Sequence, residues 1–162
     1  MKLYRKASAA ALFTASIACA LGALTGPASA SATTFKERVS FDPTGAVFSC
    51  ESADLTVTGG IVTESLESVQ DAQGTTHLTY TIVPHDATLT DGTNTYTLSG
   101  SAPLAATIGP DGEFVVVTDP THFVIRNSSG GVYAMVQVVE HFSPDGHSFV
   151  FDRGSCEAPP SD

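Results

Sequence analysis

Between residues 33 and 152 the dominant pattern is an alternation of apolar and polar side chains with a period of two. Phe35, Val39 and Phe41 alternate with basic and hydroxyl side chains, and further along the chain Leu78 and Tyr80 alternate with threonine. A period of two is typical of a β-strand with one buried face, and no segment after residue 30 shows the 3.6-residue period of an amphipathic helix. The sequence therefore predicts an all-β fold.

Glycine-containing turns divide this pattern into eight to ten short strands, with Asp91-Gly92 as the strongest hairpin signal. Gly59-Gly60 predicts either a two-residue turn or a β-bulge. Proline lacks a backbone donor, so Pro84 predicts a strand break or a corner, and Pro103 and Pro110 predict a loop or an edge at residues 100–109. Separate strands are expected at residues 113–118 and 122–126, on either side of Asp119-Pro120.

Short connections between consecutive strands favour an antiparallel meander. Such a sheet must close on itself or stack as two sheets to protect its edges. We expect a single antiparallel up-and-down β-barrel of about eight strands, because the last hairpin is long and a cysteine pair joins the two ends of the domain. A two-sheet β-sandwich is the alternative.

The first 30 residues have the pattern of a secretory signal. Three basic residues within positions 1–6 precede an apolar run over residues 7–24, and small residues at positions 28–30 predict cleavage after Ala30. Residues 31–162 then form a single secreted β domain in the extracellular space. The alternative is a protein lipid-anchored at Cys19, against which Ser16 stands where lipoprotein signals usually have a branched apolar residue.

Removal of the signal leaves four basic residues, Lys36, Arg38, Arg126 and Arg153, against 17 acidic ones, a net charge near −13. Such a charge makes nucleic acid and anionic membranes poor partners. We therefore expect no nucleic acid partner and no membrane association after signal cleavage. Composition leaves the oligomeric state open.

Cys50 lies near the start of the mature domain and Cys156 lies near its end. Export to an oxidising compartment favours a Cys50–Cys156 disulfide. Closing a loop of about 106 residues would stabilise the fold by about 4 to 5 kcal/mol if the effect is the lost entropy of the unfolded chain. The two ends of the domain are therefore expected to lie side by side.

Glu140 is a catalytic candidate in the last predicted hairpin. A four-residue turn at residues 143–146 would place Glu140 opposite Phe149, and would put Phe149 and Phe151 on the apolar core face. Glu140 would then lie at the end of that face, where burial could raise its pKa and suit it to acid–base chemistry. His141 would point to the other side.

Glu64 is the second catalytic candidate, since a two-residue turn at Gly59-Gly60 would place it beside Leu55. A bulge at these glycines would reverse its side. Tyr80, Tyr96 and Tyr133 are weak ligand-binding candidates, because half-buried tyrosines can direct their hydroxyls at a ligand.

The sequence contains no recognised motif for metal binding, nucleophilic catalysis or nucleotide binding. The five histidines show no zinc-site spacing, and the patterns of calcium loops, nucleophile elbows, P-loops and dinucleotide sites are absent. No metal site and no cofactor is predicted.

The segment at residues 138–146, the segment at residues 55–60 and the outlying cysteine pair resemble a group of short secreted actinobacterial β-rich proteins of unknown function. The resemblance implies export and a β domain, and it assigns no activity and no site residue. Secreted bacterial proteinase inhibitors have a similar size, but they usually carry two disulfides, and the mature chain can form only one.

We expect a non-enzymatic β-barrel that binds a small apolar or amphipathic ligand. A barrel-type cyclase or isomerase is the alternative, with Glu64 or Glu140 as the acid or base. An extracellular protein-binding module or inhibitor that works through residues 100–109 is a third hypothesis. Fold class alone does not decide among these functions.

Overall fold

The computed structural model describes residues 32–143 and 148–157, and all regular elements in these ranges are β-strands. The predicted all-β class is confirmed. No helix in this part of the chain is long and apolar enough to cross a membrane. The predicted signal at residues 1–30 lies outside the described residues. The strands are β1 (Thr33–Phe41), β2 (Val47–Cys50), β3 (Leu55–Gln70), β4 (Thr76–Thr90), β5 (Thr95–Ile108), β6 (Phe114–Asn127), β7 (Val132–Phe142), β8 (Phe149–Asp152) and β9 (Cys156–Glu157).

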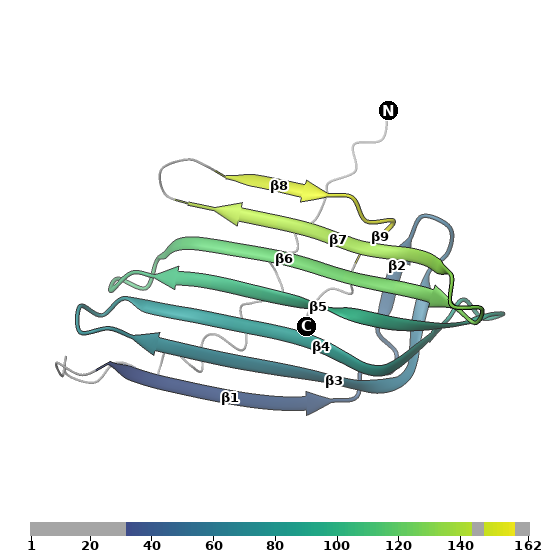
Figure 1. Cartoon of the computed structure of the whole chain (residues 1–162), viewed down its shortest axis with the longest axis horizontal. Coiled ribbons are helices and arrows are strands. Elements are labelled where there is room, and N and C mark those ends of the chain that lie inside the picture. Colours follow the sequence, from purple (N-terminus) through teal and green to yellow (C-terminus); the bar gives the residue numbers. More distant parts are fainter. Residues whose placement is uncertain (1–31, 144–147, 158–162) are drawn as a thin grey trace.

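The strands form one antiparallel sheet in the order β8-β7-β6-β5-β4-β3-β2-β9, and β1 also pairs with β3. From β3 to β8, neighbours in the sheet are neighbours in the sequence, which confirms the predicted meander. The sheet curls into a half-barrel. Figure 1 shows the long strands β3 to β7 side by side, with β1 and β8 at opposite margins.

Closure of the half-barrel occurs at one end only. There β2 pairs with both β3 and β9, and the segment before β9 bonds to β7 through Arg153 N to Gln137 O (3.0 Å) and Ser155 N to Met135 O (2.8 Å). At the other end β1 and β8 are the sheet edges, and no pairing joins them within residues 32–143 and 148–157. At this end the half-barrel is therefore bordered by β1 and β8, each of which has one unpaired edge within the described residues.

The glycine pair forms a bulge inside β3, so the bulge was the correct alternative. Its expected effect on Glu64 was wrong, because Glu64 still shares the apolar face with Leu55 and Leu66. The register with β4 shifts on both sides of Gly59, and the strand continues to Gln70. Gly60 has φ +112°, and a Cβ at this position would lie 2.5 Å from the Cα of Ala87. Only glycine can adopt this backbone conformation so close to β4.

The predicted break at Pro84 is absent, since β4 continues through it, although the β4–β5 register shifts between Ile82 and Ala87. Two further predicted interruptions are wrong: residues 100–109 lie mostly in β5, and β6 continues through Asp119 and Pro120. The β5–β6 ladder runs up to the pair Ser101–His122 and resumes at Ala105–Thr118. Pro103 and Pro120 lie in the stretch between these pairs, where the ladder has a gap. The prolines remove ladder donors without ending either strand, because each strand is also paired with its other neighbour.

The predicted register of the last hairpin is wrong by one residue. Glu140 lies opposite Val150, and His141 lies opposite Phe149. Because strand side chains alternate, the shift moves Phe149 and Phe151 to the face of His141, away from the core. The His141 and Phe149 rings stack there with centroids 5.5 Å apart. The predicted turn at residues 143–146 lies almost entirely outside the described residues.

Two apolar clusters lie on one face of the sheet. The first, at the closed end, contains Leu55 and Leu89, which are fully buried. The second, toward the open end, contains Leu66, Leu78 and Leu104. We call the face that carries both clusters the inner face, and the opposite one the outer face.

Candidate functional site

A group of polar side chains lies on the inner face between the two apolar clusters. We call this group the polar belt; it consists of Glu64, Tyr80, Asp119, Thr121 and Glu140. Each member occupies an inward position because its strand alternates strictly there, as in β6, where Val117, Phe123 and Ile125 share the face of Asp119.

Asp119 and Glu140 are direct cross-strand partners on β6 and β7. Asp119 is only 7% exposed, and its Oδ1 accepts a hydrogen bond from Thr121 Oγ1 at 2.7 Å. Burial raises the pKa of Asp119. Burial also raises the pKa of Glu140, and the charge of Asp119 adds to that effect. Two adjacent carboxyl groups of this kind can hold one proton between them or neutralise a bound cation.

Neutral isosteres at this pair should stabilise the fold at pH 7. A carboxyl group with a raised pKa destabilises the folded state once the pH is above that pKa, so Asp119→Asn removes an unfavourable buried charge. We expect Asp119→Asn to raise the midpoint of thermal unfolding at pH 7 and to have a smaller effect at pH 3. The exposed Glu113→Gln is the control for net charge. A lower midpoint for Asp119→Asn at pH 7 would show that its charge is already compensated.

Glu64 and Tyr80 form the other half of the polar belt, on β3 and β4. Burial raises the pKa of Tyr80, and its hydrogen bond to Glu64 and the charge of that carboxylate raise the pKa further. The Tyr80 hydroxyl therefore stays protonated and donates to Glu64. The two sequence candidates Glu64 and Glu140 thus lie on the same face, on strands β3 and β7.

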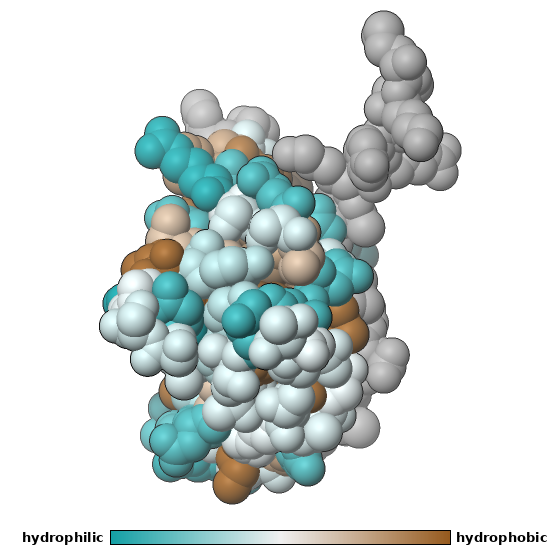
Figure 2. All heavy atoms as spheres, turned by 90° about the vertical axis from the view of Figure 1, so that its right-hand side faces the viewer, coloured by the Kyte–Doolittle hydropathy of each residue, from teal (hydrophilic) through white to brown (hydrophobic). Residues whose placement is uncertain are grey.

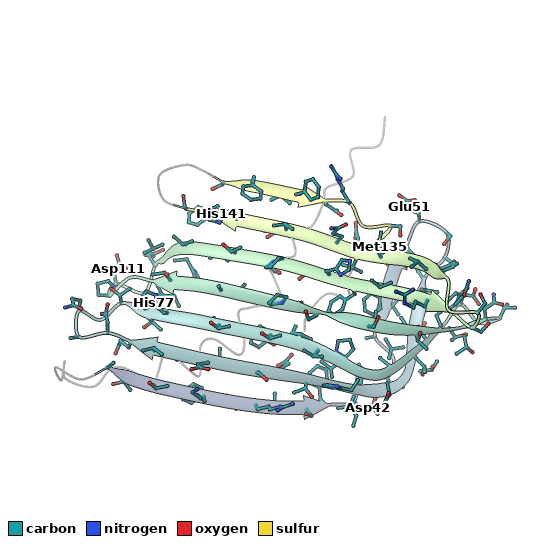
Figure 3. The ribbon with its side chains drawn as sticks, in the orientation of Figure 1. Asp42, Glu51, His77, Asp111, Met135 and His141 are labelled. Atoms are coloured by element: carbon teal, nitrogen blue, oxygen red, sulfur yellow. A yellow bond between two sulfur atoms is a disulfide. The ribbon has the colours of Figure 1, made fainter. Side chains whose placement is uncertain are left out.

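Charge is segregated between the two faces. The ionisable groups on the inner face of β1 and β3–β8 are acidic or phenolic within the described residues, whereas Lys36 and Arg38 lie on the outer face. Lys36 forms an ion pair there with Glu67 at 2.8 Å. Figure 3 shows His77 and His141 at the same end of the sheet but on strands separated by β5 and β6. Among the described residues no group of three or more His, Cys, Asp or Glu side chains could hold a metal ion.

The other two tyrosine candidates belong to a network at the closed end. Tyr96 donates to Asp91 Oδ2 at 2.7 Å, and Tyr133 shares a 2.7 Å hydrogen bond with Ser52. The Tyr96 and Tyr133 rings lie 4.5 Å apart. The hydrogen bond to Asp91 is the main reason that the pKa of Tyr96 rises to about 12. Figure 2 shows this end as mainly hydrophilic, with a few separate apolar patches. Both hydroxyls are thus engaged in local structure.

Asp91 should stabilise the folded state at neutral pH, and this stabilisation should be lost in acid. Hydrogen bonds from Asn94, Tyr96 and Thr93 hold the pKa of Asp91 well below its usual range. A lowered pKa stabilises the fold above the unfolded-state value near 4, and the stabilisation is lost as the pH falls toward the folded-state pKa. We expect Asp91→Ala to lower the thermal midpoint clearly at pH 7 and much less at pH 2. The exposed Asp54→Ala should change neither, and an equal loss from Asp91→Ala at both pH values would contradict the assignment.

The predicted disulfide is present. Cys50 and Cys156 are direct partners in the β2–β9 pair, with Cα atoms 3.9 Å apart. The bridge therefore joins the first and last strands of the closed end.

A shallow depression of about 420 Å³ lies on the outer face over β1, β3 and β4. Lys36, Arg38 and Glu67 contribute to its walls together with threonine hydroxyls. These side chains are exposed and strongly solvated, so water competes well with any ligand there. The inner face, where polar groups are buried beside apolar clusters, is the better candidate.

Asp119 and Thr121 are residues of the polar belt that the sequence prediction missed, because Pro120 suggested a turn. The signal was present: Val117, Asp119, Thr121, Phe123 and Ile125 follow the period of two without interruption. This period, followed through Pro120, places a carboxylate on a buried face.

Comparisons with protein-family models, with curated proteins and with solved structures give no match for this chain. The inner face itself is therefore the basis for a function.

Proposed function

We propose that the mature protein is a secreted, non-enzymatic binding protein that holds a small amphipathic molecule on the inner face of its half-barrel. The observation that carries the proposal is the polar belt, a set of buried and half-buried polar side chains between two apolar clusters on one face. Ligand sites combine an apolar surface with a few convergent polar groups in this way.

The margins of the inner face support the proposal. Phe41 on β1 and Val150 on β8 share the inner face with their cross-strand partners Val62 and Glu140. They are nevertheless 45% and 68% exposed. Apolar side chains left open on both free edges offer contact area to a ligand that enters between β1 and β8.

The proposal includes secretion of the protein after signal cleavage. The basic, apolar and small-residue segments of residues 1–30 support cleavage after Ala30. The Cys50–Cys156 disulfide is compatible with an extracellular protein.

A neutral probe with a matched pair of blocking variants tests this function. Ala102 lies on the inner face opposite Ile82, and the exposed Ala105 lies on the outer face of the same strand, so Ala102→Phe and Ala105→Phe place the same ring on opposite sides. We expect 1-decanol to bind the mature protein in a calorimetric titration, and Ala102→Phe to weaken binding at least about tenfold, since the ring fills the space of the ligand. Ala105→Phe should bind like the unchanged protein.

Circular dichroism must show that both variants are folded. Equal affinity of the two variants, or tighter binding by Ala102→Phe, would exclude the inner face as the binding surface.

A further inference from the structure

The inner face has negative charge without a counterion. Glu37, Glu64, Asp119, Glu140 and Asp152 lie on it, and the basic side chains of the described residues lie elsewhere. The Asp119–Glu140 pair has the strongest need for a compensating positive charge. Asp119 is only 7% exposed and accepts its hydrogen bond from a neutral donor, Thr121. Buried carboxylates are normally compensated by a cation or by several donors.

A second and independent observation concerns Ser68. Its side chain lies on the inner face of β3, opposite Leu78 of β4, and is 2% exposed. Its Oγ is the one buried side-chain polar atom without a hydrogen-bond partner in the described part of the chain. Buried hydroxyls almost always have a partner, so Ser68 is a polar position on the inner face that the described part of the chain leaves unpaired.

We propose that the ligand of the inner face is an organic amine, with an ammonium group held by Asp119 and Glu140 and an apolar body lying against Leu66 and Leu104. This inference rests on the proposed function and adds the chemical class of the ligand. Two carboxylates on neighbouring strands can accept two N–H donors of one ammonium group, which forms short charge-assisted hydrogen bonds.

The geometry favours an ammonium group over a metal ion. Calcium takes six to eight oxygen ligands, whereas this pair offers two carboxylates, and no third His, Cys, Asp or Glu joins them within the described residues. An ammonium group has three hydrogen-bond donors, and in an organic amine it is attached to an apolar group. Such a molecule contacts both the carboxylate pair and the apolar cluster of the inner face.

Three probes with the same chain length test the class. Decylamine, 1-decanol and decanoate differ only in the head group, and the amine is charged at pH 7. We expect decylamine to bind at least about tenfold more tightly than 1-decanol, and decanoate to bind more weakly than both. Asp119→Asn with Glu140→Gln should abolish the preference, so that decylamine and 1-decanol bind the double variant with similar affinity. Glu113→Gln, which removes an exposed carboxylate, should preserve the preference.

Proton release gives a readout that a general change of structure would not reproduce. The ammonium group competes with the proton on the carboxyl pair, so binding should release protons and should strengthen as the pH rises from 4 to 7. Titration calorimetry in phosphate and in HEPES, neither of which is a primary amine, should give different apparent enthalpies for the unchanged protein. The difference should disappear in the double variant, where Glu37, Glu64, Tyr80 and Asp152 remain as the other titratable groups on this face.

The outcomes separate the two proposals. If 1-decanol binds and decylamine binds no more tightly, the inner face binds apolar molecules and the amine proposal is wrong. If none of the three probes binds, both proposals are wrong. If Ca²⁺ alone binds with the same dependence on Asp119 and Glu140, the pair is an inorganic cation site and the amine proposal is again overturned.

Discussion

Replacing both cysteines by serine, Cys50→Ser with Cys156→Ser, is expected to lower the free energy of unfolding by about 4–5 kcal/mol. The bridge closes a loop with a sequence separation of 106 residues, and opening it enlarges the conformational entropy of the unfolded chain. A domain of this kind has a total stability of roughly 5–15 kcal/mol, so the loss removes a large part of it. Urea unfolding of the oxidised protein and the double variant measures the difference.

The control is Ser49→Ala, a neighbouring exposed position on β2. It should change the stability by less than about 0.5 kcal/mol. If the double cysteine variant lost only about 1 kcal/mol, the unfolded chain would already hold its ends together without the bridge.

Gly60→Ala is expected to lower the free energy of unfolding by at least about 2 kcal/mol. The added Cβ would lie 2.5 Å from the Cα and 2.8 Å from the N of Ala87, and the backbone φ of +112° is itself unfavourable for alanine. The strand cannot move away without breaking its ladder with β4. Urea unfolding again gives the measurement.

Gly112→Ala separates the two causes, since Gly112 has φ +86° and an added Cβ there would meet no atom within 4 Å. It carries the backbone strain without the collision and should lose less stability than Gly60→Ala. Equal losses for the two variants would mean that the close approach of β3 and β4 at the bulge contributes nothing.

The fold could be predicted from the sequence where one physical rule decides the outcome. Period-two alternation predicted the strands, and short turns predicted the meander, because both are local properties of the chain. The Cys50–Cys156 disulfide could be predicted because these are the two cysteines that follow the predicted signal peptide. Gly59-Gly60 remained ambiguous because a turn and a bulge demand the same backbone freedom.

The errors arose where neighbouring strands override a local preference. Pro103 and Pro120 indicate breaks when taken alone, yet each lies in a long strand that also pairs along its other edge. The last hairpin depended on a turn length, and a difference of one residue moved Phe149 to the outer face. Register is a property of two strands together, so a single strand carries little information about it.

The candidate site was predictable only in part, for the same reason. Glu64 and Glu140 could be found in the sequence because each carboxylate interrupts an apolar pattern. Their common face, and the pairing of Glu140 with Asp119, depend on a bulge and a β6–β7 register that only the sheet defines. Tyr80, Tyr96 and Tyr133 looked equivalent in the sequence, and the structure places only Tyr80 in the polar belt.

The most direct test of ligand binding on the inner face is a methyl NMR experiment on the mature protein with 1-decanol. We expect nuclear Overhauser contacts from the decyl chain to the inner-face methyl groups of Leu66, Leu104 and Val138. Contacts confined to the outer-face methyl groups of Val83, Val116 and Val139, or no contact at a saturating probe concentration, would contradict binding on the inner face.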